Sequence, residues 1–261
     1  MRVYVASLCS GLDRAANRDA ALAALEEAAT AGARLAVLPE YTSVFDPRGT
    51  SPAEAEPLDG PFLQAVGAVA RARGLVVVVG TLIPGSSGDR AVNAVAVLDG
   101  GVLVGVYRKV HLYDAFGHRE SDRLEAGAPD QAAVVVDVDG LRVGVMTCYD
   151  LRFPESARRL ADAGATLLVV PAAWASGEHK SEQWRLLLRA RAVEDVAYVV
   201  GSVQRGAGVT GEALAVDPWG VVLAEGRGGP VVVDLDPDAV VRARERNPSL
   251  LNRRYDVVPR G

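Results

Sequence analysis

Residues 143–159 read VGVMTCYDLRFPESARR, a stretch that joins an apolar run to a cysteine and then to helix-like sequence. The run over residues 143–146 is typical of a buried strand, and the helical pattern begins just after Pro154. Cys148 is therefore placed at the carboxyl end of a strand, where ligands approach the sheet of an α/β protein. The same position suits a buried structural thiol, since free cysteine is among the most buried residue types. This segment alone leaves both interpretations open.

The rest of the chain repeats this alternation of apolar strands and amphipathic helices. Helical spacing occurs in four segments, at residues 18–31, 61–73, 155–163 and 181–193. Hairpin-like pairs at residues 94–107 and 211–226 indicate mixed rather than all-parallel sheets. We predict an α/β fold in which helices cover two face-to-face sheets. The other expected strands cover residues 3–8, 35–38, 75–80, 134–138, 142–146, 166–170 and 198–203.

Size, composition and charge fit one globular domain. At 261 residues the chain is near the upper limit for one hydrophobic core, and we predict a single domain over residues 1–261. Its 49% hydrophobic and 23% charged residues argue against a disordered or fibrous protein. The net charge of -5 comes without a clustered basic face, so we expect no nucleic-acid partner.

The apolar segments and the cysteines predict a cytoplasmic protein. Stretches such as LVVVVGTLI, residues 75–83, are far shorter than the ~20 residues that cross a bilayer, so we expect no membrane partner. No signal-peptide pattern follows Met1. Two cysteines, Cys9 and Cys148, are too few for a disulfide framework, which favours a reducing compartment.

Two further charged residues also follow strands. Glu40 ends LAVLPE, residues 35–40, and a carboxylate beside a thiol can take its proton. Lys109 follows a strand in VYRKVHLYDAFGHRES, residues 106–121, and we expect its charge to lower the pKa of the Cys148 thiol. Either residue alone could be an ordinary surface charge. The aperiodic segments 42–57 and 112–131 are candidate binding loops.

Other catalytic signatures are missing from the sequence. The three histidines and two cysteines show no paired ligand spacing, so we expect no metal. His111 and His118 are expected loop residues, with room for one of them to orient a partner. Nucleotide-binding glycine motifs and a G-x-S-x-G nucleophile turn do not occur.

Three blocks in this order, PEY, YRKVHLYDAFGHRES and CYDLRFPES, resemble the signature blocks of the nitrilase, or carbon–nitrogen hydrolase, superfamily, and the resemblance covers essentially the whole chain. It implies a four-layer α-β-β-α sandwich that hydrolyses carbon–nitrogen bonds without a cofactor. It also implies that Glu40 is the base that activates the nucleophile Cys148, that Lys109 completes the triad and that Glu120 is an additional glutamate beside it. The backbone N–H of Tyr149 would join Lys109 in stabilising the oxyanion. A thioester would form on Cys148 and then be hydrolysed by water.

The resemblance further implies a homodimer or higher homo-oligomer, in which a C-terminal tail over about residues 243–261 packs on the partner. The amino-acid sequence of the blocks is most similar to that of Nit-type amidases, such as ω-amidase and deaminated glutathione amidase. One departure is TGEALAVDPWG, residues 210–220, which carries Glu212 where relatives commonly have a G-x-S block, and we assign Glu212 no role.

The substrate side is interpreted from two residues. Arg152 could pair with Asp150 or with a helix, whereas its planar fork would also match a substrate carboxylate. Trp174, at the end of an expected strand, could wall the pocket. We therefore predict hydrolysis of a small, carboxylate-bearing amide to an acid and ammonia. The alternatives are a nitrile or N-carbamoyl hydrolase and a catalytically silent homologue that acts as a binding protein.

Overall fold

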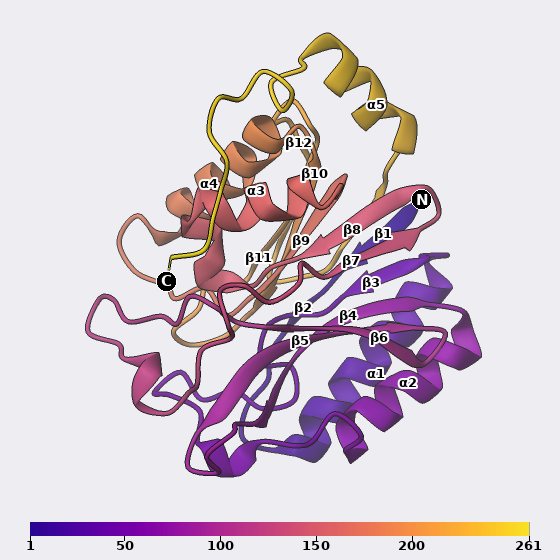
Figure 1. Cartoon of the computed structure of the whole chain (residues 1–261). Helices are drawn as coiled ribbons and strands as arrows, with labels where there is room; N and C mark the ends of the chain where they lie inside the picture. Colours follow the sequence, from indigo (N-terminus) through magenta and orange to yellow (C-terminus); the bar gives the residue numbers. More distant parts are fainter. Residues whose placement is uncertain (261) are drawn as a thin grey trace.

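The first of two sheets has six strands in the order β13-β1-β3-β4-β5-β6. The computed structural model describes residues 1–260, and Figure 1 shows this sheet beside the two N-terminal helices. Neighbours β1, β3 and β4 run parallel, whereas β5, β6 and β13 pair antiparallel. The strands are β1 (Arg2–Val5), β3 (Leu35–Val37), β4 (Val76–Pro84), β5 (Ala91–Asp99), β6 (Val102–Arg108) and β13 (Val231–Asp234).

The second sheet has the order β12-β11-β10-β9-β8-β7, with the short strand β2 paired to β10. Strands β8, β9 and β10 run parallel, and hairpins add β7 at one edge and β11 with β12 at the other. The strands are β2 (Ser7–Leu8), β7 (Val135–Val138), β8 (Leu141–Val145), β9 (Leu167–Ala172), β10 (Tyr198–Gln204), β11 (Glu212–Val216) and β12 (Val222–Arg227).

Helices cover the outer face of each sheet, which gives four layers. Helices α1 (Arg14–Thr30) and α2 (Pro61–Arg73) bury their apolar faces on the first sheet. Helices α3 (Pro154–Asp162) and α4 (Lys180–Asp195) do so on the second. A separate cluster of mainly Val, Leu and Tyr side chains from both sheets fills the space between them. The predicted α-β-β-α sandwich is confirmed, and within residues 1–260 no helix is both long and apolar enough to span a membrane.

The sequence-predicted helices and all but one of the predicted strands form, with ends that shift by a few residues. The single strand expected over residues 3–8 was wrong, because the chain passes from the first sheet to the second at Ala6 and forms β1 in one and β2 in the other. Strand β13 and helix α5 (Pro237–Arg246) were not expected. Helix α5 buries only Val240 and Ala243, so its apolar stripe is too thin to detect among its charged residues. The helix also continues to Arg246, so the expected start of the tail near residue 243 was too early.

The tail after α5 runs back over its own chain. Figure 1 shows this last segment passing in front of α3 and α4. Arg253 donates to the Asp162 carboxylate at the end of α3, at 3.0 Å. This contact holds part of the tail without a partner subunit.

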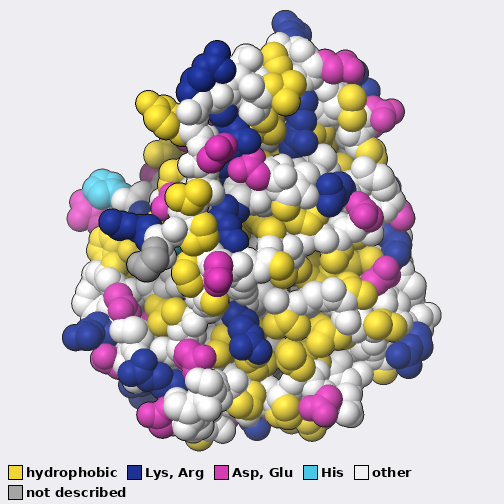
Figure 2. All heavy atoms as spheres, viewed as in Figure 1, with side chains coloured by type: hydrophobic (Ala, Val, Ile, Leu, Met, Phe, Trp, Pro, Cys, Tyr) yellow, Lys and Arg dark blue, Asp and Glu magenta, His cyan; other side chains and the backbone are white. Residues whose placement is uncertain are grey.

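The surface mixes charges of both signs, and one edge of the sandwich is apolar. On the face in Figure 2, basic and acidic side chains are interspersed, and hydrophobic side chains gather over the region of β6 and β7. Val102, Leu103 and Val104 of β6 are 59%, 39% and 48% exposed, so this edge strand presents apolar side chains to solvent.

Candidate active site

The predicted site residues meet where strands of the two sheets end. Glu40 follows β3 and Lys109 follows β6 in the first sheet, whereas Cys148 follows β8 in the second. All three, together with Glu120, line one cavity of about 330 Å³. Both loops proposed from the sequence, residues 42–57 and 112–131, supply further walls of this cavity.

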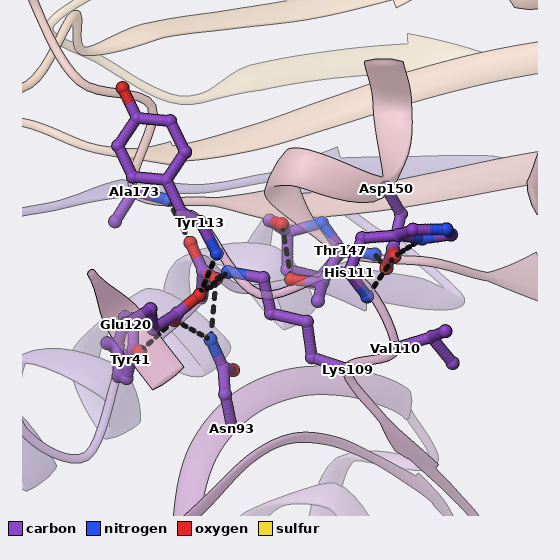
Figure 3. Close-up of polar contacts among 12 residues, drawn as sticks. Tyr41, Asn93, Lys109, Val110, His111, Tyr113, Glu120, Thr147, Asp150 and Ala173 are labelled. Carbon is purple, nitrogen blue, oxygen red and sulfur yellow. Dashed lines mark hydrogen bonds and ion pairs between the residues drawn. The ribbon is translucent and has the colours of Figure 1, made fainter. Parts of the chain in front are cut away.

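Lys109 forms the centre of the polar network. Its side chain is almost fully buried, and its Nζ lies 2.9 Å from Glu40 Oε1 and 2.8 Å from Glu120 Oε2. Figure 3 shows the ammonium pointing into this group. Burial acts to lower the pKa of Lys109, but the two carboxylates outweigh it and raise the pKa well above its usual value. Lys109 is therefore an ammonium ion at neutral pH.

Both carboxylate oxygens of Glu40 accept hydrogen bonds. Oε1 accepts from Lys109 and from Asn93 Nδ2, at 2.7 Å, and Oε2 accepts from the backbone N–H of Ala173, at 2.7 Å. Sequence reasoning missed Asn93 and Ala173. Asn93 could have been found, because it is a polar side chain in the otherwise apolar strand sequence AVNAVAVL, whereas the Ala173 contact uses only backbone.

Close packing of the backbone also fixes the position of Glu40. A Cβ atom on Gly80 of β4 would lie 2.4 Å from Glu40 Cα, and Tyr41 next to it has a left-handed φ of 57°. From β10 in the other sheet, the buried Gln204 side chain donates to the Glu40 carbonyl at 3.0 Å. The turn that carries Glu40 is therefore held from both sheets.

Glu120 is held by donors from three sides. Lys109 donates from one side, Tyr41 Oη from a second at 2.5 Å, and the backbone N–H of Tyr113 from a third at 2.6 Å. Burial acts to raise the pKa of Glu120, but the Lys109 charge and these hydrogen bonds hold it below its usual value. Tyr41 remains a protonated donor, because burial and the Glu120 charge raise its pKa well above the usual value.

Cys148 begins a short 3₁₀ helix, η3 (Cys148–Arg152), in a left-handed conformation with φ of 46°. It is 7% exposed at the cavity wall. The expectation that Lys109 lowers the pKa of this thiol was wrong in its net outcome. Burial raises the pKa of Cys148 well above its usual value and the Glu40 carboxylate raises it further, and together they outweigh the opposing effect of Lys109. The resting sulfur is therefore a thiol, which needs a base before it can attack.

A second buried carboxylate ties the Cys148 turn to the Lys109 segment. Asp150 is fully buried and accepts from the backbone N–H of Thr147 at 3.0 Å and from Tyr107 Oη at 2.8 Å. His111 Nδ1 lies 2.8 Å from Asp150, and its ring stacks on Phe153. His111 is thus the histidine with an orienting position.

His118 takes no part in that contact. Its ring packs near Tyr113, 5.4 Å between centroids, at the wall of the large cavity.

A smaller cavity of about 20 Å³ adjoins Cys148 and is lined by Tyr149, Arg152 and Trp174, as well as by the unanticipated Lys180. Of the structural alternatives for Arg152, pairing with Asp150 was wrong, whereas contact with a helix is found, since Arg152 Nη2 donates to Gln183 of α4 at 2.7 Å.

Trp174 is the wall that the sequence predicted. Its ring is 3% exposed, and its Nε1 donates to the carbonyl of Lys180 at 3.0 Å. Glu212, at the start of β11, is not among the residues that line either cavity. In the part of the chain that the structure describes, no group of His, Cys, Asp and Glu side chains is arranged to hold a metal ion.

Comparison with known proteins gives one family and several close relatives. The model of the carbon-nitrogen hydrolase family matches residues 3–245. The hydrolase Rv0480c of Mycobacterium tuberculosis is 39% identical over 97% of this chain and 95% of its own. Deaminated glutathione amidase of Escherichia coli O157:H7 is 36% identical over 92% of both chains. A solved mutant of the Nesterenkonia amidase, with an acetamide moiety added covalently at its active-site cysteine, has a TM-score of 0.79 and 26% identity, covering 97% of this chain and 95% of that one.

Replacing Lys109 with methionine removes the ammonium and leaves two buried carboxylates facing each other. We expect the free energy of unfolding to fall by about 3–5 kcal/mol at pH 7, because one partner of a buried ion pair is lost. Lys180→Met is the matched control, since Lys180 is 7% exposed and donates to Tyr113 Oη rather than to a carboxylate. Urea titration measures both variants, and equal losses would contradict the central role of Lys109.

The pH dependence of this loss has a definite sign. Because the folded pKa of Glu120 lies below its usual 4.5, Glu120 contributes stability that is present above the unfolded pKa and is lost as the pH falls through the folded pKa. Removing Lys109 removes that contribution. We therefore expect the stability difference between wild type and Lys109→Met to shrink below about pH 4, near the unperturbed pKa of glutamate.

Proposed function

The chain belongs to the carbon–nitrogen hydrolase family and is an enzyme that hydrolyses amides, and we propose that its substrate is a small, carboxylate-bearing amide cleaved to an acid and ammonia through a thioester on Cys148. The observation that supports this proposal is a buried, protonated thiol beside the Glu40 carboxylate, whose geometry is fixed by Lys109. A base next to a thiol of raised pKa is the arrangement that nucleophilic attack by cysteine requires.

In the first step, Glu40 takes the Sγ proton as Cys148 attacks the amide carbonyl carbon. The carbonyl π electrons move to oxygen, and a tetrahedral intermediate forms. Glu40 then returns the proton to the amide nitrogen, the C–N bond breaks, and ammonia leaves the thioester. A single carboxylate carries the proton from sulfur to nitrogen, so no second acid is needed.

The developing oxyanion is stabilised by Lys109 and by the backbone N–H of Tyr149. Tyr149 is the second residue of η3, and N–H groups in the first turn of a helix have no acceptor within that helix. Lys109 keeps its charge throughout because its pKa is raised. Donors of this kind in other hydrolases each contribute about 2.7–4 kcal/mol to the transition state.

In the second step, water replaces ammonia and Glu40 acts again as the base. Glu40 takes a proton from the water as its oxygen attacks the thioester carbon. The C–S bond breaks, and the departing sulfur regains its proton from Glu40. The products are the carboxylic acid and the free thiol, so the enzyme returns to its starting state.

The carboxylate on the substrate is inferred from Arg152, which lines the smaller cavity beside Cys148. Deaminated glutathione amidase of E. coli, 36% identical to this chain, takes by its name an amide substrate, which agrees with this class. We rank nitriles and N-carbamoyl compounds below such amides.

We also propose a homodimer of one-domain subunits. Half-exposed apolar side chains of α4 and of the β11–β12 turn lie together, since Arg189 of α4 donates to the carbonyl of Gly220 and Val193 lies against that glycine. Val193, Trp219 and Val221 are 47%, 50% and 55% exposed. Clustered apolar surface of this kind marks subunit contacts.

The substrate proposal is tested by ammonia release from succinamate, 2-oxoglutaramate, deaminated glutathione, a simple aliphatic amide and a nitrile. We expect wild type and Cys9→Ala to hydrolyse the carboxylate-bearing amides, and Cys148→Ala to lose at least about 1,000-fold because the nucleophile is gone. Turnover of only the aliphatic amide and the nitrile would contradict the substrate class. Full activity of Cys148→Ala would contradict the nucleophile.

Glu120→Gln separates a positioning role from that of a second base. Among the described residues, the Glu120 carboxylate accepts only from groups that orient it or Lys109, namely Lys109 itself, Tyr41, Asn93 and the backbone N–H of Tyr113. We therefore expect kcat to fall about 10- to 100-fold with KM changed less than about threefold, the pattern for lost transition-state stabilisation. The shape of the pH profile should not change. Loss of one ionisation from the profile of kcat against pH would instead identify Glu120 as a base.

Subunit association is tested by multi-angle light scattering on the protein as it elutes from a size-exclusion column. We expect twice the mass of the chain, and a shift toward the monomer for Val193→Lys, because a charge would enter the contact. Leu12→Lys is the control, since Leu12 is 55% exposed but precedes α1. A monomeric wild type rules out the dimer.

A further inference from the structure

Within residues 1–260, two cations beside Cys148 have no carboxylate partner. Arg152 donates to the neutral amide of Gln183, and Lys180 Nζ donates to Tyr113 Oη at 3.1 Å. Arg152 Nε is buried and has no hydrogen-bond partner among these described residues. Lys109, which lines the larger cavity on the other side of Cys148, shows how a buried cation is usually stabilised, because two carboxylates contact it. The Arg152 and Lys180 pair therefore lacks the anion that such a site needs.

Aromatic rings take the place of acidic side chains around this pair. The Arg152 guanidinium lies 4.9 Å from the Trp174 ring centroid, and Lys180 Nζ lies 3.4 Å from that of Phe116. Ring faces attract cations but do not neutralise them. Burial lowers the pKa of Lys180, and the positive charge of Arg152 lowers it further. The negative charge of a bound anion would oppose this lowering.

The space between the cations is closed in the unliganded protein. The cavity at Cys148, Arg152 and Lys180 measures about 20 Å³, room for about one water molecule and too little for a carboxylate group. Trp174 is buried and fixed by the Lys180 carbonyl, so it cannot yield easily. Space for an anion must therefore come from a residue that covers the cations.

Phe116 does not line the small cavity, but its ring covers both cations and can move. It is 66% exposed, and it lies in the loop between Lys109 and Glu120 with a left-handed φ of 56°. Gly117 follows with φ of 84°, so the tip of the loop is a turn with little packing. The Phe116 ring lies over Lys180 and also reaches the Arg152 guanidinium, 5.7 Å from its centroid. Moving one exposed ring therefore uncovers both cations.

We propose that Lys180 and Arg152 together bind the carboxylate of the substrate, and that Phe116 is a lid that covers the two cations when the site is empty and moves aside when the anion enters. This rests on the proposed amide hydrolysis and assigns its specificity to residues beyond the catalytic group. Cys148 lines both cavities. A substrate whose amide carbonyl carbon lies at the Cys148 sulfur can therefore place its carboxylate between the two cations while its amide nitrogen faces Glu40 in the larger cavity.

Lys180→Gln tests the cation pair with two matched substrates, succinamate and its neutral counterpart succinamide. We expect kcat/KM for succinamate to fall at least tenfold, mainly through KM, with less than a threefold change for succinamide. Lys180→Arg should retain most of the activity toward succinamate. Arg18→Gln is the control for the loss of one positive charge, because Arg18 lies on α1, pairs with Asp19 and lines neither cavity. Equal losses on both substrates would overturn the proposal while leaving amide hydrolysis intact.

The lid is tested by calorimetric binding of succinate to Cys148→Ala, with Phe116 present or replaced by alanine. Because binding to the closed form must first remove the ring from Lys180, we expect the Phe116→Ala background to bind succinate at least about threefold more tightly. Equal or weaker binding would overturn the lid. These titrations measure binding and do not depend on turnover, so they test succinate binding at the cation pair even in an inactive enzyme. Failure of wild type to hydrolyse any of the amides would instead overturn the proposed function.

Discussion

The buried ammonium of Lys109 between the carboxylates of Glu40 and Glu120 is the interaction on which the site depends. Without it, two carboxylates in a closed site would repel each other. The ammonium keeps the Glu120 pKa low and fixes one oxygen of Glu40, while Ala173 fixes the other. The Glu40 carboxylate is therefore held in place beside the thiol whose proton it accepts.

Burial, together with the same network, explains why the sulfur rests as a thiol. A lone lysine beside a cysteine stabilises the thiolate, but here the charge of Lys109 is already balanced by carboxylates, and one of them faces the sulfur. The net outcome is a raised pKa of Cys148. A neutral resting nucleophile with its base in place forms its charge only when the substrate is present, which suits the proposed transfer of one proton from sulfur to the leaving nitrogen.

Local signals in the sequence indicated two sheets and placed the central residues at strand ends, and the resemblance to the nitrilase superfamily implied the four-layer fold and joined these residues in one site. Apolar runs that end in Glu40, Lys109 and Cys148 place each residue at a strand end, and strand ends of the two sheets meet at one cavity. The direction of the Cys148 pKa shift could not be predicted from local sequence, since it depends on burial and on the combined effect of the Glu40, Lys109 and Glu120 charges. Lys180 was also missed, because a single lysine at the start of a helix has no distinguishing pattern, and only the folded chain brings it next to Arg152 and Phe116.

The central claim is that amides pass through a thioester on Cys148, and partitioning with hydroxylamine tests it most directly. A primary amide and a methyl ester of the same acid are hydrolysed in the presence of hydroxylamine, and acid and hydroxamate are counted. A shared thioester requires the same ratio of hydroxamate to acid from both substrates at each hydroxylamine concentration, with neither product formed by Cys148→Ala. Ratios that differ between the substrates, or steady hydrolysis with no hydroxamate, would mean that water attacks the substrate directly and would contradict the account.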